Sequence, residues 1–313
     1  MPIANPNYFT GNPLERLSEK RGDALWFAEQ LAHEKACMVP FWRGRPLVEM
    51  PDGPEGQARA LWLSPLARSE FVHDAPVVLL GFRDGAPYFA LDASASGASA
   101  ETAPFADMAS YKGMRELAGM LSREEVAILG QALWLLDWHR RHQFCANCGA
   151  KSQMVGGGTH RRCDGCDTDH FPRTDPVAIV LVSRGEDCLL GRGVKFPPTF
   201  FSALAGFLEP GETLEECAAR EVFEEVGVKV NDVRYIFSQP WPFPSSLMAG
   251  YIAETEDTTF TLDETEIAEA RWVSKDEIRA LLNGERRDDL NIPPPFAIAH
   301  QLLVEWVRDE DHV

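Results

Sequence analysis

The chain has 313 residues, of which 45% are hydrophobic and 25% charged, a composition typical of folded globular proteins and sufficient for two cores. Its formal charge of −18 disfavours nonspecific attraction to nucleic acid, because a polyanion would be repelled on average. No apolar run approaches the roughly 18 residues of a membrane span, and the first residues lack the basic and apolar regions of an export signal. We therefore expect a cytoplasmic protein with no membrane partner.

Alternating apolar stretches and turn signals over the first 140 or so residues predict an N-terminal α+β domain. Strands are expected at residues 60–63, 77–82 and 87–91, with turns at Asp52-Gly53 and Asp84-Gly85. The stretch 92–103 is rich in Ala, Ser and Gly and predicts a loop. Residues 124–142 predict a helix, which runs directly into a cysteine-rich segment.

Four of the seven cysteines form two C-x2-C pairs, Cys145 with Cys148 and Cys163 with Cys166. Each pair can present two thiolates from a tight knuckle, and the two pairs together make a tetrahedral four-sulfur site. The spacing predicts a zinc ribbon with a closed, structural Zn²⁺ site. The alternative is two disulfides or unrelated free thiols, and disulfides would need an oxidising compartment. His160 and His170 lie near the ribbon, but four thiolates already fill the tetrahedral shell.

Downstream of the ribbon the sequence predicts a mixed α/β pattern. A continuous apolar run at 177–182 indicates a buried strand with a hairpin partner at 187–190. Further strands are expected at 234–238, 247–253 and 269–273, and helices at 275–282 and 295–308. We place boundaries near residues 143 and 173, giving an N-terminal domain 1–143, a zinc ribbon 144–172 and a C-terminal domain 173–313.

The segment 206–228, GFLEPGETLEECAAREVFEEVGV, begins with the signals of a loop followed by a helix. Gly206, Pro210 and Gly211 predict a tight loop. Thr213, with Glu216 three residues later, predicts the capping box of a helix, which is expected to end at a left-handed Gly227.

Three carboxylates, Glu221, Glu224 and Glu225, fall within five residues of that predicted helix. They repel one another unless a cation lies between them. Mg²⁺ and Mn²⁺ prefer oxygen ligands and bind through a few carboxylates together with substrate phosphates. A solvated acidic helix face is the alternative for the helix taken alone.

The spacing from Gly206 through Glu212, Arg220-Glu221 and Glu224-Glu225 to Gly227 resembles the Nudix box at every defining position. The resemblance implies an α/β fold, a Nudix α/β/α sandwich with a mixed sheet, that hydrolyses a nucleoside diphosphate linked to another group. It implies that Glu221, Glu224 and Glu225 bind metal and that Glu225 or Glu224 also activates water. Arg220 would orient these carboxylates by ion pairing, and Glu212 would be an outer member of the network.

Two further metal ligands are implied by the same resemblance. The carbonyl of Ala205, which precedes the box, would complete a metal site. Glu266 corresponds to a distal metal-binding glutamate of the family, with Glu264 as the alternative in the same acidic stretch.

Residues 238–245, SQPWPFPS, alternate three prolines with two aromatic residues, which fixes an extended backbone that carries stacking surfaces. Taken alone, the segment could be a Pro-rich structural turn or a peptide-recognition ligand. Downstream of a Nudix box it resembles the SQPWPFPxS element of NADH pyrophosphatases, a zinc-containing branch of the superfamily. The resemblance covers roughly residues 115–313.

This second resemblance implies hydrolysis of NADH to reduced nicotinamide mononucleotide and AMP, with NAD⁺ as a slower substrate, removal of NAD caps from RNA, and a homodimer. The implied substrate-binding residues are Phe207, Phe171, Gln239, Pro240, Trp241, Pro242, Phe243, Pro244, Ser245, Ser246 and Ala299. Core packing is the alternative for Phe207 and Phe171. Arg115 is a candidate phosphate contact.

Other functions remain open from the residues. The basic runs 139–142 and 160–162 favour a solvated helix end and hairpin tip, with a phosphate or RNA contact surface as the alternative. The substrate could instead be ADP-ribose, a dinucleoside polyphosphate or coenzyme A. A non-catalytic, nucleic-acid-binding nucleotide sensor is a further alternative, but such a sensor would be expected to lose some of the catalytic carboxylates.

Overall fold

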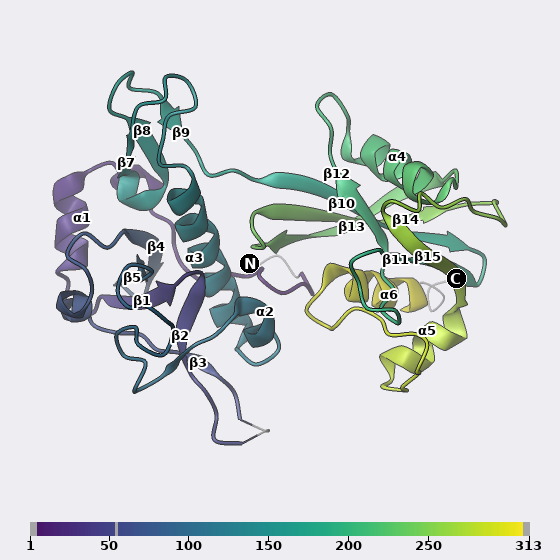
Figure 1. Ribbon diagram of the computed structural model, residues 1–313, viewed down its shortest axis with the longest axis horizontal. Helices are drawn as coiled ribbons and strands as arrows, with labels where there is room; N and C mark the ends of the chain where they lie inside the picture. Colours follow the sequence, from purple (N-terminus) through teal and green to yellow (C-terminus); the bar gives the residue numbers. More distant parts are fainter. Residues whose placement is uncertain (1–4, 54–55, 309–313) are drawn as a thin grey trace. The chain divides into compact units, whose positions relative to one another are not determined.

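The computed structural model describes residues 5–53 and 56–308, which form two compact units (Figure 1). Phe9–Arg173 and Pro242–Ser245 belong to the first unit, and Thr174–Trp241, 246–308 and 5–8 belong to the second. In this described part of the chain, no helix has both the length and the apolar character that a membrane crossing requires. The expectation that the first residues carry no export signal falls partly on residues 1–4, outside the described residues.

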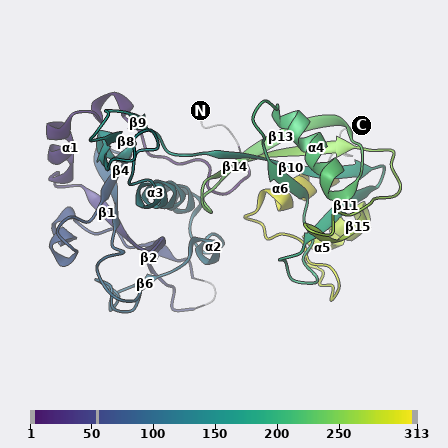
Figure 2. The same cartoon turned by 45° about the horizontal axis from the view of Figure 1, so that its top comes forward.

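The first unit contains a mixed sheet with the strand order β3-β2-β1-β5-β4, and β6 pairs with β2. Its strands are β1 (Cys37–Trp42), β2 (Arg45–Glu49), β3 (Arg59–Ala60), β4 (Val77–Arg83), β5 (Ala86–Asp92) and β6 (Ser110–Tyr111). Its helices are α1 (Ala24–Leu31), α2 (Met114–Leu117) and α3 (Arg123–Arg141). Figure 2 looks along α3, which contacts β2, β4 and β5. The predicted strands 77–82 and 87–91 and helix 124–142 are therefore confirmed, whereas β1, β2 and α1 were not predicted.

The zinc ribbon is a three-stranded antiparallel sheet of β7 (Ser152–Val155), β8 (His160–Cys163) and β9 (Asp169–His170) within the first unit. It is fixed to α3 by buried polar contacts. Arg161 on β8 donates to Ser152 Oγ at 2.8 Å and to His139 of α3, and His139 Nε2 donates to the carbonyl of Gly158 at 2.8 Å. Burial lowers the pKa of His139 to about 4, so this imidazole is neutral and works as a structural contact.

The second unit contains a mixed sheet with the strand order β13-β14-β10-β11-β15, and β12 pairs with β10. Its strands are β10 (Asp175–Arg184), β11 (Asp187–Gly193), β12 (Leu204–Phe207), β13 (Asn231–Trp241), β14 (Ser246–Glu254) and β15 (Ile267–Ser274). Its helices are α4 (Leu214–Val226), α5 (Lys275–Leu282) and α6 (Ile298–Arg308).

The alternation of side chains along β10 builds the layers of this unit. Ala178, Val180 and Val182 pack in one core with α4, whereas Ile179 and Leu181 pack in a second core with α5 and α6. A strand buried on both faces needs such a continuous apolar run, because successive side chains point to opposite sides. The α/β/α sandwich with a mixed sheet is thereby confirmed.

Three elements differ from the sequence-based expectation. Gly206 was expected in a loop but lies in β12, paired with Ala178. Strand β13 continues to Trp241, because its one proline, Pro240, lies in an edge strand of the described sheet, where a missing N–H group costs little. The last helix starts at Ile298, three residues after the Pro293–Pro295 triplet with which it was expected to begin.

The capping box of α4 generates a stability prediction. The Thr213 hydroxyl accepts the N–H of Glu216 at 3.2 Å, and the Glu216 carboxylate accepts the N–H of Thr213 at 2.7 Å. Thr213→Ala removes the first bond and should destabilise α4 by about 1 kcal/mol. Thr213→Ser, which keeps the hydroxyl, is the control. Faster amide hydrogen exchange in the first turn of α4 in the Ala variant alone is expected, and equal exchange in both variants would contradict the assignment.

Candidate active site

Helix α4 carries the clustered glutamates on a firmly seated element. Cys217, Ala218, Val222 and Val226 are fully buried against the sheet, and Gly227 ends the helix with φ 68° in the left-handed region. Anchoring one stripe of α4 in the core fixes the neighbouring positions 221 and 225 toward the end of β12. The helix therefore positions the glutamates, and the neighbouring loop and strand β12 contact them.

Arg220 is the centre of the carboxylate cluster. Its Nε donates to Glu212 at 2.5 Å, and its Nη1 donates to Glu221 at 2.8 Å and to Glu224 at 2.7 Å. Its Nη2 reaches the carbonyl of Phe207 at 3.0 Å, which joins the helix to the end of β12. One guanidinium thus orients three carboxylates and a backbone carbonyl, a planar multidentate role that a lysine could not fill.

A glycine is required at position 206 because the carboxylate of Glu221 lies very close to the backbone there. A Cβ built on Gly206 would lie 1.8 Å from the carboxyl carbon of Glu221, so any larger residue would displace that carboxylate. Glu221 therefore lies directly against the backbone of β12. The glycine that opens the motif makes room for the carboxylate and has no positive φ to satisfy.

Glu225 is 7% exposed, and its Oε2 atom has no hydrogen-bond partner among the described residues. Burial raises the pKa of this carboxyl to about 8, with further contributions from the charges of Glu221 and Glu266. Burial also raises the pKa of Glu221, helped by Glu224 and Glu266. A buried carboxylate with one unpartnered oxygen, set among like charges, is a position at which a bound cation would be stabilising.

The segment that carries Glu266 is tied to the end of α4. Asp263 N–H donates to the Glu225 carbonyl at 3.0 Å, and Thr261 N–H donates to the Val226 carbonyl at 2.8 Å. On the other side, Val194 N–H donates to the carbonyl of Glu266 at 2.9 Å. Glu266, and not Glu264, is among the charges that raise the pKa values of Glu221 and Glu225. The contact from Val194 was missed, because no local pattern in the sequence links residues 72 positions apart.

The oxygen donors of Glu221, Glu225, Glu266 and the Ala205 carbonyl are of the chemical type that a hard divalent cation prefers. Glu221, Glu225 and Glu266 are carboxylates that repel one another, and the Ala205 carbonyl lies on β12 beside Gly206. Their oxygens are not gathered around one point. Among the described residues, the four ribbon cysteines form the one group of three or more His, Cys, Asp or Glu side chains whose ligand atoms all lie within 4.8 Å.

The ribbon cysteines form a compact four-sulfur cluster. Cys145 Sγ lies 3.7 Å from Cys166 Sγ, and Cys148 Sγ lies 3.4 Å from Cys163 Sγ, with no disulfide among the seven cysteines. Backbone N–H groups of Asn147 and Gly165 donate to Cys145 and Cys163, as in the knuckles of a metal site. This arrangement supports structural zinc.

Two of the implied substrate residues, Phe207 and Gln239, lie in one row across the sheet of the second unit. Phe207, Val177, Met248 and Gln239 form a row across β12, β10, β14 and β13. Three strand spacings of about 4.8 Å separate the ends of this row by roughly 14 Å. Phe207 is 61% exposed, which is unlike a core residue, whereas Ala299 is buried in α6.

The remaining implied substrate residues are divided between the two units. Pro240, Trp241 and Ser246 belong to the second unit, and Pro242–Ser245 belongs to the first. Phe243 contacts Phe9 and lies under the guanidinium of Arg115, which is 4.6 Å from the ring centre. Phe171, also in the first unit, is 68% exposed and stacks on His160.

The basic runs beside the ribbon are largely neutralised. His139 and Arg161 are buried, as described above. Arg140 and Arg141 both pair with Asp137, at 2.5 and 2.7 Å, and Arg162 pairs with Asp169 at 2.8 Å. These contacts favour the solvated helix end and hairpin tip over a phosphate-binding surface.

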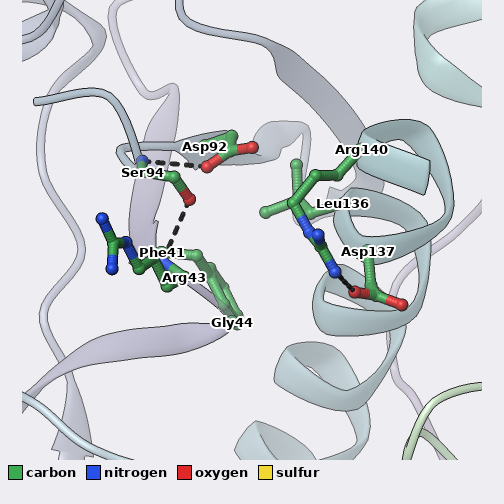
Figure 3. A pocket seen from close by; sticks show the side chains of 8 residues that line it. All are labelled: Phe41, Arg43, Gly44, Asp92, Ser94, Leu136, Asp137 and Arg140. Atoms are coloured by element: carbon green, nitrogen blue, oxygen red, sulfur yellow. Dashed lines mark hydrogen bonds and ion pairs between the residues drawn. The ribbon is translucent and has the colours of Figure 1, made fainter. Parts of the chain in front are cut away.

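The first unit also contains a cavity of about 410 Å³ between β1, β5 and α3. Figure 3 shows Arg140 directed at Asp137, and Ser94 hydrogen-bonded to Asp92 and to the backbone of Arg43. Phe41 and Leu136 supply its apolar walls. The predicted catalytic and substrate-binding residues lie elsewhere in the chain.

Three family models match the chain: an NADH pyrophosphatase-like rudimentary NUDIX domain over residues 35–138, an NADH pyrophosphatase zinc ribbon domain over 140–171, and the NUDIX domain over 172–292. The chain is 33% identical over 339 residues to the "NAD-capped RNA hydrolase NUDT12" of Macaca fascicularis, and the alignment covers 96% of this chain and 73% of that relative. The chain belongs to the Nudix hydrolase family.

Two other Nudix relatives carry related names. The chain is 39% identical to the "NAD-capped RNA hydrolase NudC" of Stutzerimonas stutzeri, covering 64% of this chain and 71% of the relative. It is also 39% identical to the human "NAD(P)H pyrophosphatase NUDT13, mitochondrial", and that alignment covers 64% of this chain and 60% of the relative. The division into domains 1–143, 144–172 and 173–313 stays a prediction.

The raised pKa of Glu225 predicts how stability depends on pH without Mg²⁺ or Mn²⁺. Between about pH 4.5 and 8 the folded Nudix unit keeps a proton that the unfolded chain has lost, so its free energy of unfolding falls as the pH rises. This fall amounts to at most about 1.4 kcal/mol per pH unit. Glu225→Gln removes it, because the amide does not titrate. Urea unfolding of both proteins at pH 5, 7 and 9 is the measurement. The advantage of the variant should grow with pH and shrink when Mg²⁺ is added, and parallel pH profiles would contradict it.

Proposed function

We propose that the chain hydrolyses the pyrophosphate of NADH and NAD⁺ to nicotinamide mononucleotide and AMP, and that it removes NAD caps from the 5′ ends of RNA. The observation that carries the proposal is the cluster of Glu221, Glu225 and Glu266 around a complete Nudix box. The named activities of the relatives and the SQPWPFP element downstream of the box support the choice of substrate.

The proposed chemistry is attack of water on one phosphorus of the pyrophosphate. A new P–O bond forms, the bridging P–O bond breaks, and two phosphomonoesters leave as protons pass to solvent. Glu225, with Glu224 as the alternative, is proposed to take the proton from the attacking water, because it is the buried carboxylate of the cluster. Arg220 holds Glu221 and Glu224 in position for the reaction.

The proposed metal ligands are Glu221, Glu224, Glu225, Glu266 and the carbonyl of Ala205. When bound there, Mg²⁺ or Mn²⁺ would offset the negative charge of the pyrophosphate and lower the pKa of a coordinated water. The buried, unpartnered oxygen of Glu225 supports this choice of ligands.

The proposed substrate contacts follow from the row of residues at the end of the sheet. Phe207 offers an exposed ring at the end of β12, and Trp241 offers a ring at the end of β13. Aromatic rings held by strands can stack on a base with little loss of conformational entropy. A homodimer and a cytoplasmic location are also proposed, on the resemblance and the sequence respectively, and size-exclusion chromatography with light scattering tests the dimer.

Glu225→Gln should lower turnover by orders of magnitude, because it removes the proposed base and a proposed metal ligand. Glu215→Gln on the same helix is the matched control, since Glu215 is exposed and contacts Tyr251. Release of AMP from NADH at saturating Mg²⁺ or Mn²⁺ is measured for both, with circular dichroism to check the fold. Near wild-type turnover in a folded Glu225→Gln variant would remove the central assignment.

A substrate panel tests the choice among Nudix activities. NADH, NAD⁺, ADP-ribose, a diadenosine polyphosphate and NAD-capped RNA are offered at equal concentration, and the products are resolved by chromatography. We expect AMP from NADH and a 5′-monophosphate RNA from the capped transcript. Efficient cleavage of ADP-ribose or the diadenosine compound without cleavage of NADH would overturn the proposed substrate but not the proposed hydrolase activity. No cleavage of any compound would favour the non-catalytic sensor.

A further inference from the structure

The segment 5–8 lies on the outer edge of strand β13, although more than 230 residues separate the two in sequence. The side-chain amides of Asn5 and Asn7 both donate to the carbonyl of Ser238, at 3.0 and 3.2 Å. Strand β13 is the end strand of the described sheet, so this carbonyl has no neighbouring strand to accept from. The two asparagines replace a missing strand at one point, just before the aromatic part of the SQPWPFP element.

Gln239 extends this attachment to a third segment. Its side chain is completely buried, and its Nε2 donates to the carbonyl of Tyr8 at 3.1 Å and to the carbonyl of Phe296 at 2.9 Å. Both protons of one amide are therefore used to join the segment 5–8, strand β13 and the loop before α6. Breaking such a buried bond leaves a polar group unsatisfied, which opposes separation of the three segments.

Three aromatic rings meet on this framework. The rings of Trp241 and Phe296 are stacked, with centroids 6.3 Å apart and planes 17° from parallel. The ring of Tyr8 meets Phe296 edge-on, with centroids 6.3 Å apart and planes at 73°. Phe296 therefore contacts both rings and links Tyr8 to Trp241.

We propose that the segment 5–8 is a positioning element of the dinucleotide site, with Tyr8 acting through Phe296 on Trp241. This inference deepens the proposed function and rests on it, because Trp241 is a proposed substrate contact. The segment precedes Phe9–Arg173 of the first unit in sequence and yet belongs to the second unit. A ring already held in its stacking position loses little entropy when a base binds, so loss of Tyr8 should weaken ground-state binding.

The carboxylates provide a contrast that makes the inference testable. They are fixed by α4, β12 and the segment around Glu266, and Tyr8 has no part in those contacts. A positioning role should therefore appear in KM and leave kcat nearly unchanged, whereas a general loss of fold would lower kcat as well.

The test compares Tyr8→Ala with Tyr8→Phe, which keeps the ring. Tyr235→Ala is the matched control, because it removes a half-exposed tyrosine ring from the same strand-bearing unit at a place where it contacts Tyr251. We expect the KM for NADH to rise about 5- to 10-fold in Tyr8→Ala, with kcat within twofold of the wild type. Tyr8→Phe and Tyr235→Ala should stay within twofold in both constants.

Unchanged KM in Tyr8→Ala, or a loss confined to kcat, would overturn the inference. Affinity for AMP, measured by calorimetry on the same proteins, separates this failure from a failure of the proposed function. If the wild type does not cleave NADH, the proposed function fails, and a weaker affinity of Tyr8→Ala for AMP still supports the positioning role. Equal AMP affinities, or no AMP binding by the wild type, would refute it.

Discussion

The second unit depends on holding like charges close together. Burial raises the pKa values of Glu221 and Glu225, and the charge of Glu266 raises both further. Coulomb repulsion and desolvation would both move these groups apart if they were free to move. Several features of the unit counter that tendency: the apolar stripe that seats α4, the backbone bonds that tie residues 261–263 to the end of the helix, and Arg220.

Arg220 offsets only part of this repulsion, because it pairs with some of the carboxylates and not with Glu225. Its guanidinium is used by Glu212, Glu221 and Glu224, whereas Glu225 has an unpartnered oxygen among the described residues. The more exposed carboxylates are therefore paired within the protein, and the buried one is the proposed point of contact for a cation. Gly206 completes this arrangement, because its missing side chain is the space in which the Glu221 carboxylate lies.

Much of the second unit could be predicted because its signals are local. The capping box of Thr213 and Glu216, the left-handed Gly227 and the apolar run of β10 are each satisfied by nearby residues, and α5 begins and ends where the sequence placed it. Contacts over long sequence distances could not be read in this way. Asn5 and Asn7 on Ser238, and Val194 on Glu266, join ordinary polar or backbone groups that no short motif distinguishes. Strands β1 and β2 were missed for a related reason, because the prolines within them resemble turn signals in the sequence.

His139 and Arg161 are buried, so their side chains are not available at the surface to bind a polyanionic substrate. Two of the basic residues beside the ribbon serve to fix β8 to α3, and others are paired with Asp137 and Asp169. The chain as a whole carries a formal charge of −18. Nonspecific attraction to RNA phosphates, which requires unpaired cationic side chains, is therefore weak on this surface. For a capped RNA we therefore expect the favourable energy to come mainly from the cap, through its bases on the proposed aromatic contacts and its pyrophosphate on cations held by the proposed glutamate ligands. The RNA beyond the cap would then contribute little to the binding energy. This would explain why one site could accept both a free dinucleotide and a capped transcript.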